Sequence, residues 1–122
     1  MASKRPAPSI PAGRLARYER LVATQPRLER KGATVPYTSV NGHMFSFLSD
    51  TGTLALRLPA DDRAAFIERY GTRLHEAHGA VMKEYVSVPE SLAADESALA
   101  AWFAASYAYV AGLKPKTTKR SR

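Results

Sequence analysis

Two tight turns in the segment 33–58 constrain the fold more than any other part of the chain, because they separate three short runs of strand-like composition. The first turn is Asn41-Gly42, and an Asn-Gly pair between such runs is the strongest short-range signal for a β-hairpin. The second is 50–52, Asp-Thr-Gly, which also favours a tight turn. Pro36 lacks a backbone N–H, so the first run suits an edge strand or a bulge. The segment therefore predicts a three-stranded antiparallel meander.

The third run of this meander has one apolar face. Leu54, Leu56 and Leu58 alternate with small or polar residues, and side chains two apart in a strand point to the same face. Such alternation is typical of an antiparallel sheet that is covered on one side.

Three segments have helical periodicity. The first begins after Gly13 and stops at 24–26, Thr-Gln-Pro; the second begins at Pro59 and ends at Gly71. The third runs from about Asp95 to Leu113. Its apolar stripe keeps helical spacing over more than four turns and consists of Leu99, Trp102, Phe103, Ser106, Val110 and Leu113.

Between the second and third helices, a second hairpin is expected. Residues 72–78 lead through Gly79 into the run 81–88, which is strand-like in its Val and Tyr content, and Pro89 ends the sheet. The order is then α-β-β-β-α-β-β-α. This order predicts an α+β two-layer sandwich, with an antiparallel five-stranded sheet and helices on one face.

The positive charge of the chain lies at its two ends. The 122 residues carry a formal charge of +7, yet residues 15–113 hold ten basic and eleven acidic side chains. We therefore expect one folded domain over 14–113, with disordered basic tails at 1–13 and 114–122. A basic tail can bind nucleic acid without sequence specificity. The cations that would do so are Lys114, Lys116, Lys119, Arg120 and Arg122.

Several protein classes are excluded or disfavoured. The chain has no Cys, which excludes disulfide scaffolds and thiolate-ligated metal sites, and no apolar signal segment, so a cytoplasmic location is expected. The uncharged run 97–113 precedes basic residues as a membrane anchor would. It is short and rich in Ala, so we interpret it as a helix that covers a core, and no membrane contact is predicted.

The histidines offer one candidate metal site. His75 and His78 form an H-x-x-H motif, with Glu84 further along the chain as a possible third ligand. A helix would place both imidazoles on one face, whereas a strand would place them on opposite faces. Because this stretch is expected to be extended, we predict two ordinary surface histidines, and neither a metal nor another cofactor.

No catalytic motif is present. The chain lacks the G-x-S-x-G and S-x-x-K patterns and any glycine-rich phosphate loop. Four strand aromatics could stack on bases, as in sheet-based RNA binders, or form ordinary cross-strand pairs; they are Tyr37, Phe45, Phe47 and Tyr85. Since clustered cations do not accompany them, we favour cross-strand pairs. A groove for a partner peptide is open on either face of the sheet.

Three stretches of the chain resemble the N-terminal domain of the TfoX/Sxy family, which is grouped with small YjbR-like proteins. They are PYTSVNGHMFSFLSDTGTLALRLP at 36–59, GAVMKEYVSVPESL at 79–92 and WFAASYAYVAGLKPK at 102–116. The resemblance extends over about 15–116 and covers the first domain alone, so the role of two-domain competence regulators is not carried over.

The resemblance implies a binding role rather than catalysis. No catalytic residues are established for such domains, and their architecture is similar to that of secretion-chaperone-like proteins, which work as homodimers. We therefore expect a small non-catalytic regulatory or interaction module that acts through a protein partner or through self-association. Weak nucleic-acid binding through the basic ends is the alternative, and a metal-dependent enzyme is a further one.

Overall fold

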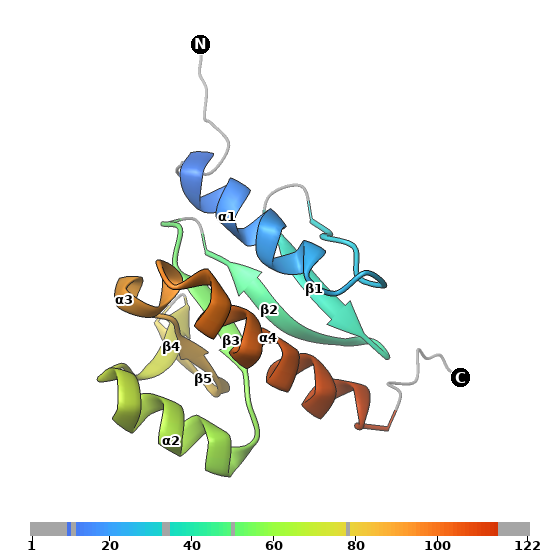
Figure 1. The fold of residues 1–122 in the computed structure, drawn as a ribbon. Helices are drawn as coiled ribbons and strands as arrows, with labels where there is room; N and C mark the ends of the chain where they lie inside the picture. The colour runs from blue at the N-terminus through green and yellow to red at the C-terminus, as the bar shows by residue number, and fades with distance from the viewer. Residues whose placement is uncertain (1–9, 11, 33–34, 50, 78, 115–122) are drawn as a thin grey trace.

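The computed structural model describes residues 10, 12–32, 35–49, 51–77 and 79–114. Five strands form one antiparallel sheet with the spatial order β1-β2-β3-β5-β4 (Figure 1). The strands are β1 (Tyr37–Val40), β2 (His43–Leu48), β3 (Leu54–Arg57), β4 (Leu74–Ala77) and β5 (Ala80–Ser87). The predicted meander and second hairpin are both confirmed.

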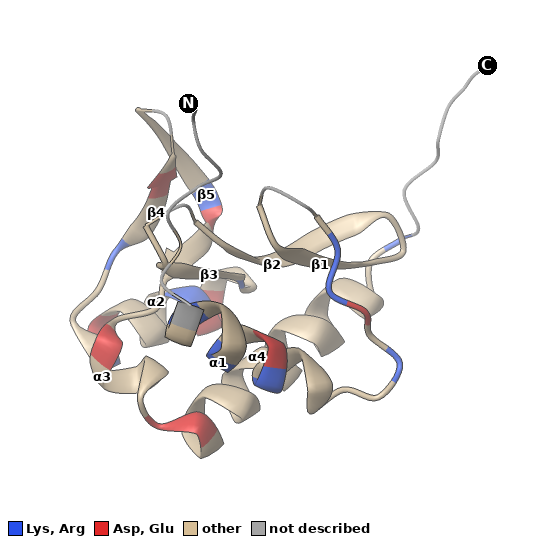
Figure 2. Cartoon of the chain, turned by 90° about the horizontal axis from the view of Figure 1, so that it is seen from above, with Lys and Arg blue, Asp and Glu red and all other residues tan. Residues whose placement is uncertain are grey.

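Four helices accompany the sheet, and all of them lie on the same side of it (Figure 2). They are α1 (Ala12–Ala23), α2 (Ala60–Tyr70), α3 (Glu90–Ala93) and α4 (Glu96–Ala111). The α+β sandwich and the order of its elements are therefore confirmed. The short helix α3 was not expected; it forms because the backbone after Pro89 turns at once, with Ala93 N–H donating to the Pro89 carbonyl at 2.9 Å.

The helix ends follow from local chemistry. Two carboxylates, Asp61 and Asp62, lie in the first turn of α2, where the helix dipole favours negative charge. Gly71 ends α2 in the left-handed conformation at φ 61°, as predicted. Asp95 caps α4, since its side chain accepts a hydrogen bond from the Ala98 backbone N–H at 3.2 Å.

The main core lies between the helices and the sheet. Leu56 and Leu58 are fully buried there, so the predicted leucine face is the covered one. α4 supplies the opposite wall through Leu99, Phe103, Ser106 and Val110. No helix in the described part of the chain is long and apolar enough to cross a membrane.

A β-bulge in β2 places two neighbouring residues on the covered face. Thr38 pairs with Ser46 while Ser39 pairs with Met44, so Phe45 is the extra residue. The Phe45 ring packs 5.4 Å from Phe103 of α4. The Ser46 hydroxyl also faces the helices, because it lies 2.7 Å from the hydroxyl of Tyr18 in α1.

Three predicted boundaries were wrong. The first helix begins at Ala12 rather than after Gly13, so residues 12–13 do not belong to the predicted disordered tail. The first strand was expected over 33–40 but begins at Tyr37, and residues 33–34 lie outside the described part. Before it, Lys31 makes an isolated bridge to Tyr37 instead of extending the strand. The last helix ends at Ala111 rather than Leu113, because the Gly112 N–H bonds back to Ala108 and Tyr109 and closes the final turn.

Candidate functional site

The face of the sheet opposite the helices, called the open face below, carries a second and smaller apolar cluster. Phe47 and Ala55 pair across β2 and β3, and Ala55 pairs with Ser87 of β5. Phe47 is 6% exposed and Ala55 is 0% exposed, yet neither belongs to the core beneath the helices. Tyr85 joins them, with its ring 5.6 Å from that of Phe47.

His75 of β4 lies beside this cluster and is buried at 6% exposure. Its Nδ1 lies 2.8 Å from the Ser87 hydroxyl, and its ring meets Phe47 edge to face at 5.1 Å between centroids. Burial lowers the pKa of His75 below the ordinary value of 6.5, because it penalises the charged form. The imidazole is therefore neutral at neutral pH and can donate one hydrogen bond and accept another.

A groove of about 1120 Å³ runs along this part of the molecule. It forms where the turn after β2, the start of β4 and the end of β5 meet. Its apolar wall is built by Val35 and Phe47. The charged residues in its lining balance, since two are basic and two acidic: Arg14, Arg73, Glu76 and Glu90. Hydroxyl groups are numerous, and they belong to Ser49, Thr51, Thr53, Thr72 and Ser87.

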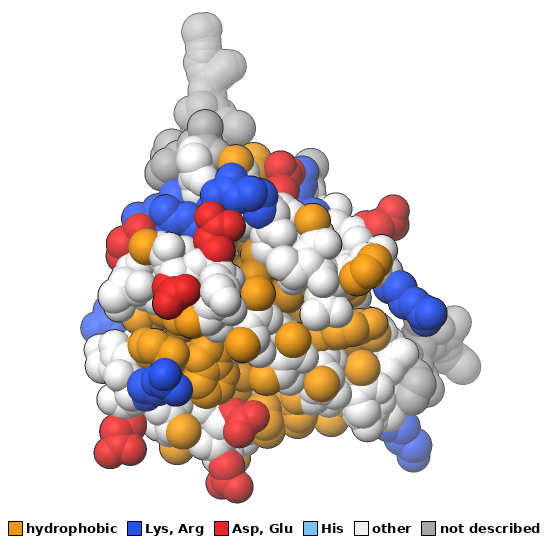
Figure 3. All heavy atoms as spheres, viewed as in Figure 1, with side chains coloured by type: hydrophobic (Ala, Val, Ile, Leu, Met, Phe, Trp, Pro, Cys, Tyr) orange, Lys and Arg blue, Asp and Glu red, His pale blue; other side chains and the backbone are white. Residues whose placement is uncertain are grey.

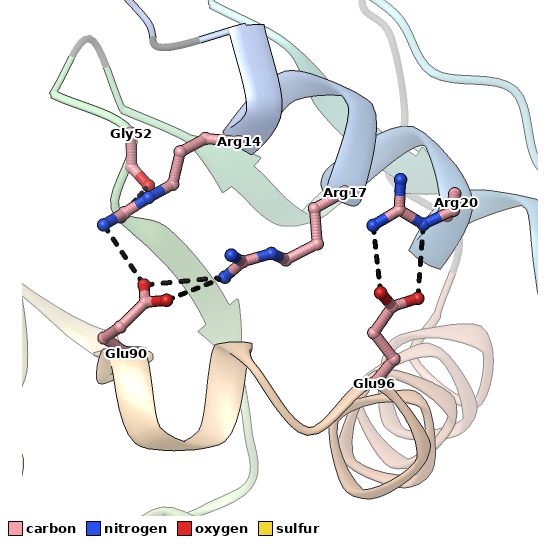
Figure 4. A network of polar contacts seen from close by, with 6 residues as sticks. All are labelled: Arg14, Arg17, Arg20, Gly52, Glu90 and Glu96. Atoms are coloured by element: carbon pink, nitrogen blue, oxygen red, sulfur yellow. Dashed lines mark hydrogen bonds and ion pairs between the residues drawn. The ribbon is translucent and has the colours of Figure 1, made fainter.

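An ion-pair network closes one end of the groove (Figure 4). Arg14 of α1 donates to the Gly52 carbonyl at 3.0 Å and contacts Glu90 at 3.1 Å. Arg17 reaches the same carboxylate at 3.3 Å. One turn further on, Arg20 pairs with Glu96 at 2.9 Å. These contacts fasten α1 to α3 and α4, so the three arginines are engaged within the chain.

The polar side chains of Tyr85, Arg57 and Glu84 also have partners within the chain. The Tyr85 hydroxyl donates to the Met44 carbonyl at 2.6 Å, and burial raises the pKa of Tyr85. Arg57 Nε lies 2.6 Å from a Glu84 carboxylate oxygen. The Arg57 guanidinium also lies 6.0 Å from the centre of the Tyr109 ring, a distance compatible with a weak cation–π contact.

The candidate metal ligands are engaged elsewhere. Glu84 pairs with Arg57, His75 contacts Ser87, and His78 lies outside the described residues. Within the described ranges, no group of three His, Asp or Glu residues could hold a metal ion. The prediction that His75 is an ordinary surface histidine is wrong, because β4 folds its side chain against Phe47.

The predicted nucleic-acid residues are placed only in part. Lys114 is exposed just beyond α4, and its carbonyl contacts the His43 Nε2 at 2.9 Å. Lys116, Lys119, Arg120 and Arg122 lie outside the described part of the chain. Of the strand aromatics, Phe45 faces the helices and cannot stack on a ligand at the open face. The preferred interpretation as cross-strand pairs is confirmed for Tyr37 of β1, which pairs with Phe47 of β2. Tyr85 of β5 packs against Phe47 across the intervening strand β3.

The helix side of the molecule has a different character. Apolar side chains gather around α4 in the space-filling view, whereas charged side chains lie mostly towards the rim (Figure 3). The outer surface of α4 presents small side chains, including the exposed Ala101 and Ala108. This surface holds none of the buried polar groups that the groove offers.

Sequence reasoning missed the contact between His75 and Ser87. Twelve positions separate them, and only the pairing of β4 with β5 brings them together. The sequence indicated this contact only weakly. If 72–78 forms a strand that pairs with 81–88, either His75 or His78 lies on the face of the sheet that packs against neighbouring strand side chains.

Comparison with known proteins gives one match. The family model described as the TfoX N-terminal domain matches residues 38–110, which extend from β1 into α4. No curated protein and no solved structure matches the chain. Helix α1 and the segment that follows it lie outside the matched residues.

Proposed function

The chain belongs to the TfoX N-terminal domain family, and on this premise we propose that it is a non-catalytic module that acts through protein contact, including contact with a second copy of itself. The uncovered sheet face carries this proposal. Of the described residues, the exposed large apolar side chains are Val35 at 43% and Val81 at 50%. Val35 lines the groove, and Val81 pairs with Glu76, which also lines it. Apolar side chains that gather beside one groove favour a contact surface there.

The chemistry of the groove supports binding rather than catalysis. Ser87 and His75 form a potential nucleophile and base, but among the described residues the imidazole hydrogen-bonds to Ser87 alone. A catalytic histidine needs a further group that orients it and stabilises its charged form. The burial that lowers the pKa of His75 also makes that charged form costly.

Sedimentation velocity of the full chain over a wide concentration range tests the proposal. We expect reversible dimer formation, weakened by Val81→Glu, which puts a charge beside the groove. The matched control is Ala101→Glu, on the exposed surface of α4 across the molecule, and it should leave the association unchanged. A chain that stays monomeric at every concentration contradicts self-association. Equal weakening by both substitutions contradicts the assignment to the open face.

Nucleic-acid binding through the ends of the chain is the second candidate. Five arginines of the described part pair with glutamates, namely Arg14, Arg17, Arg20, Arg30 and Arg57. Since residues 15–113 hold ten basic and eleven acidic side chains, the excess of cations that phosphate contacts would use lies at the ends. Fluorescence anisotropy of a random DNA duplex should show binding whose log K falls with log salt at about −0.9 per phosphate neutralised. Alanine substitution of all five cations from Lys114 to Arg122 should abolish it; unchanged binding contradicts this candidate.

A further inference from the structure

We infer that a second copy of the chain pairs with the outer edge of β4, so that the two sheets join into one through an antiparallel β4–β4 contact. This inference deepens the proposed function and rests on it, because it names the edge through which self-association occurs. The spatial order β1-β2-β3-β5-β4 gives the sheet two edges, at β1 and at β4, on opposite sides (Figure 1).

The edge at β1 is closed by the chain itself. The Tyr37 N–H donates to the Lys31 carbonyl at 2.9 Å, and the Lys31 N–H donates to the Tyr37 carbonyl at 2.8 Å. Lys31 thereby occupies the side of β1 that faces away from β2. Its ammonium group also reaches the Ser39 hydroxyl at 3.4 Å. Another strand can add at Tyr37 only by displacing Lys31.

The edge at β4 directs backbone groups outward. The Arg73 carbonyl accepts a hydrogen bond from the Ser87 N–H at 3.1 Å, so it points towards β5. Backbone groups of successive residues in a strand point to opposite sides, so those of Leu74 and Glu76 point away from β5. Among the described residues, no backbone group outside β5 bonds to either of them. Such a row of outward N–H and C=O groups is a template for another strand.

Charge favours a second copy in the antiparallel direction. Arg73 directly precedes β4, and Glu76 lies near its end. Both side chains are exposed, and neither makes an ion pair with any residue that the structure describes. Two antiparallel copies place the basic start of each strand beside the acidic end of the other, whereas parallel copies place like charges side by side. The strand therefore complements itself.

A two-fold axis at His75 matches the outward groups of the two strands. Leu74 of each copy then lies opposite Glu76 of the other, and each such pair exchanges two hydrogen bonds. Arg73 of one copy lies opposite Ala77 of the other. Because the backbone groups of Arg73 and Ala77 point towards β5, this pair forms no hydrogen bonds across the contact, and its Cα atoms lie about 4.5 Å apart.

The contact also joins the two grooves. β4 forms one side of the groove, since His75, Glu76 and Ala77 belong to its lining. The His75 ring lies on the open face, where it meets Phe47. The axis places the His75 residues of both copies opposite each other, so the groove of one copy continues into that of the other. The dimer then offers a longer binding surface than the single chain.

Disulfide formation in the full chain tests the register of this contact. The chain has no Cys, so Arg73→Cys/Ala77→Cys carries the only two thiols. Within one copy these positions lie about 13 Å apart, at about 3.3 Å per residue, which is too far for a disulfide. Between antiparallel copies they lie opposite each other. We expect the double variant to form a covalent dimer about tenfold faster than Arg73→Cys or Ala77→Cys alone.

Sedimentation velocity of Glu76→Pro gives a second measurement. Proline removes the outward N–H and is tolerated at a sheet edge, so β4 keeps its pairing with β5 while each copy loses one hydrogen bond to the other. We expect association to weaken about tenfold. The matched control is Ser39→Pro on the other edge strand, two residues after Tyr37, and it should associate as the natural chain does. Circular dichroism identifies a variant that has lost its fold.

The outcomes separate this inference from the proposed function. Equal rates of disulfide formation in the double and single variants overturn the inference, and so does a folded Glu76→Pro that associates as the natural chain does. If Glu76→Pro loses its fold, the disulfide rates decide. A dimer in solution that fails these tests leaves the proposed self-association in place and assigns it to another surface. A chain that stays monomeric at every concentration overturns both.

Discussion

The attachment of α1 to the sheet gives the sharpest test of the structure, through the hydroxyl group of Tyr18. Tyr18 is 2% exposed, and its hydroxyl lies 2.7 Å from the hydroxyl of Ser46, which in turn contacts that of Thr38. Tyr18→Phe keeps the ring and removes this link. A buried hydrogen bond contributes about 1 kcal/mol net, so we expect the variant to lose about that much unfolding free energy at pH 8.

The same hydroxyl makes the effect depend on pH. Burial raises the pKa of Tyr18 to about 12, from 10.0 in the unfolded chain. Below pH 10 both states keep the proton, and the stabilisation is complete. Above pH 10 the unfolded state ionises first, so the stabilisation is lost as the pH rises towards 12. At pH 11 the loss is about 1.4 kcal/mol. Tyr18→Phe has no hydroxyl to ionise at this position, so its unfolding free energy does not fall in this way. Near pH 11 the natural chain and Tyr18→Phe should therefore be about equally stable.

Urea unfolding followed by circular dichroism, at several pH values between about 8 and 11.5, measures this crossing. The control is Tyr107→Phe, since the Tyr107 hydroxyl bonds to no described residue while its ring packs 5.7 Å from Phe45. The unfolding free energy of Tyr107→Phe should differ little from that of the natural chain at every pH. If the difference in unfolding free energy between Tyr18→Phe and the natural chain is constant over this range, the Tyr18 hydroxyl is not buried against Ser46 as described.

Three further outcomes follow from the same contacts. Asp95→Ala should cost about 1 kcal/mol of unfolding free energy by removing the cap of α4, and Asp95→Asn should recover most of it in the same urea assay. Because burial lowers the pKa of His75, the unfolding free energy of the natural chain should fall as the pH drops below 6.5. In His75→Gln the unfolding free energy should depend less on pH between about pH 5 and 8, and the same dependence in both proteins would contradict the burial of His75. Gly32→Ala should cost about 1–3 kcal/mol or more, since Gly32 has φ +88° and a new Cβ would lie 2.1 Å from the Val35 carbonyl oxygen; a thermal scan showing no change would refute that geometry.

Local pattern was sufficient for most of the fold. The Asn41-Gly42 turn, the alternation of leucines in β3 and the stripe of α4 each depend on neighbours within one element, and each was predicted correctly. Gly71 was placed at the end of α2 for the same reason, because only a residue tolerant of positive φ suits that position.

The missed features depend on contacts between elements. The bulge at Phe45 breaks the alternation of β2, because the chain must place both Phe45 and Ser46 beneath the helices. A regular strand would have put Phe45 and Phe47 on one face. Instead they serve different clusters, one against Phe103 and the other against His75. The sequence of β2 alone does not indicate the bulge, since its cause is the contact of Phe45 with α4 and of Ser46 with α1.

The distribution of contacts separates stability from binding in this molecule. On the helix side, buried apolar residues and the arginine–glutamate pairs hold the helices in place. On the open face, Val35 and Val81 are exposed, and Arg73 and Glu76 make no ion pair with any described residue. Substitutions at such exposed charges usually change stability by less than about 0.5 kcal/mol. The open face can therefore change its partner while the sandwich stays folded, and binding assays should respond to Glu76 and Arg73 where unfolding assays do not.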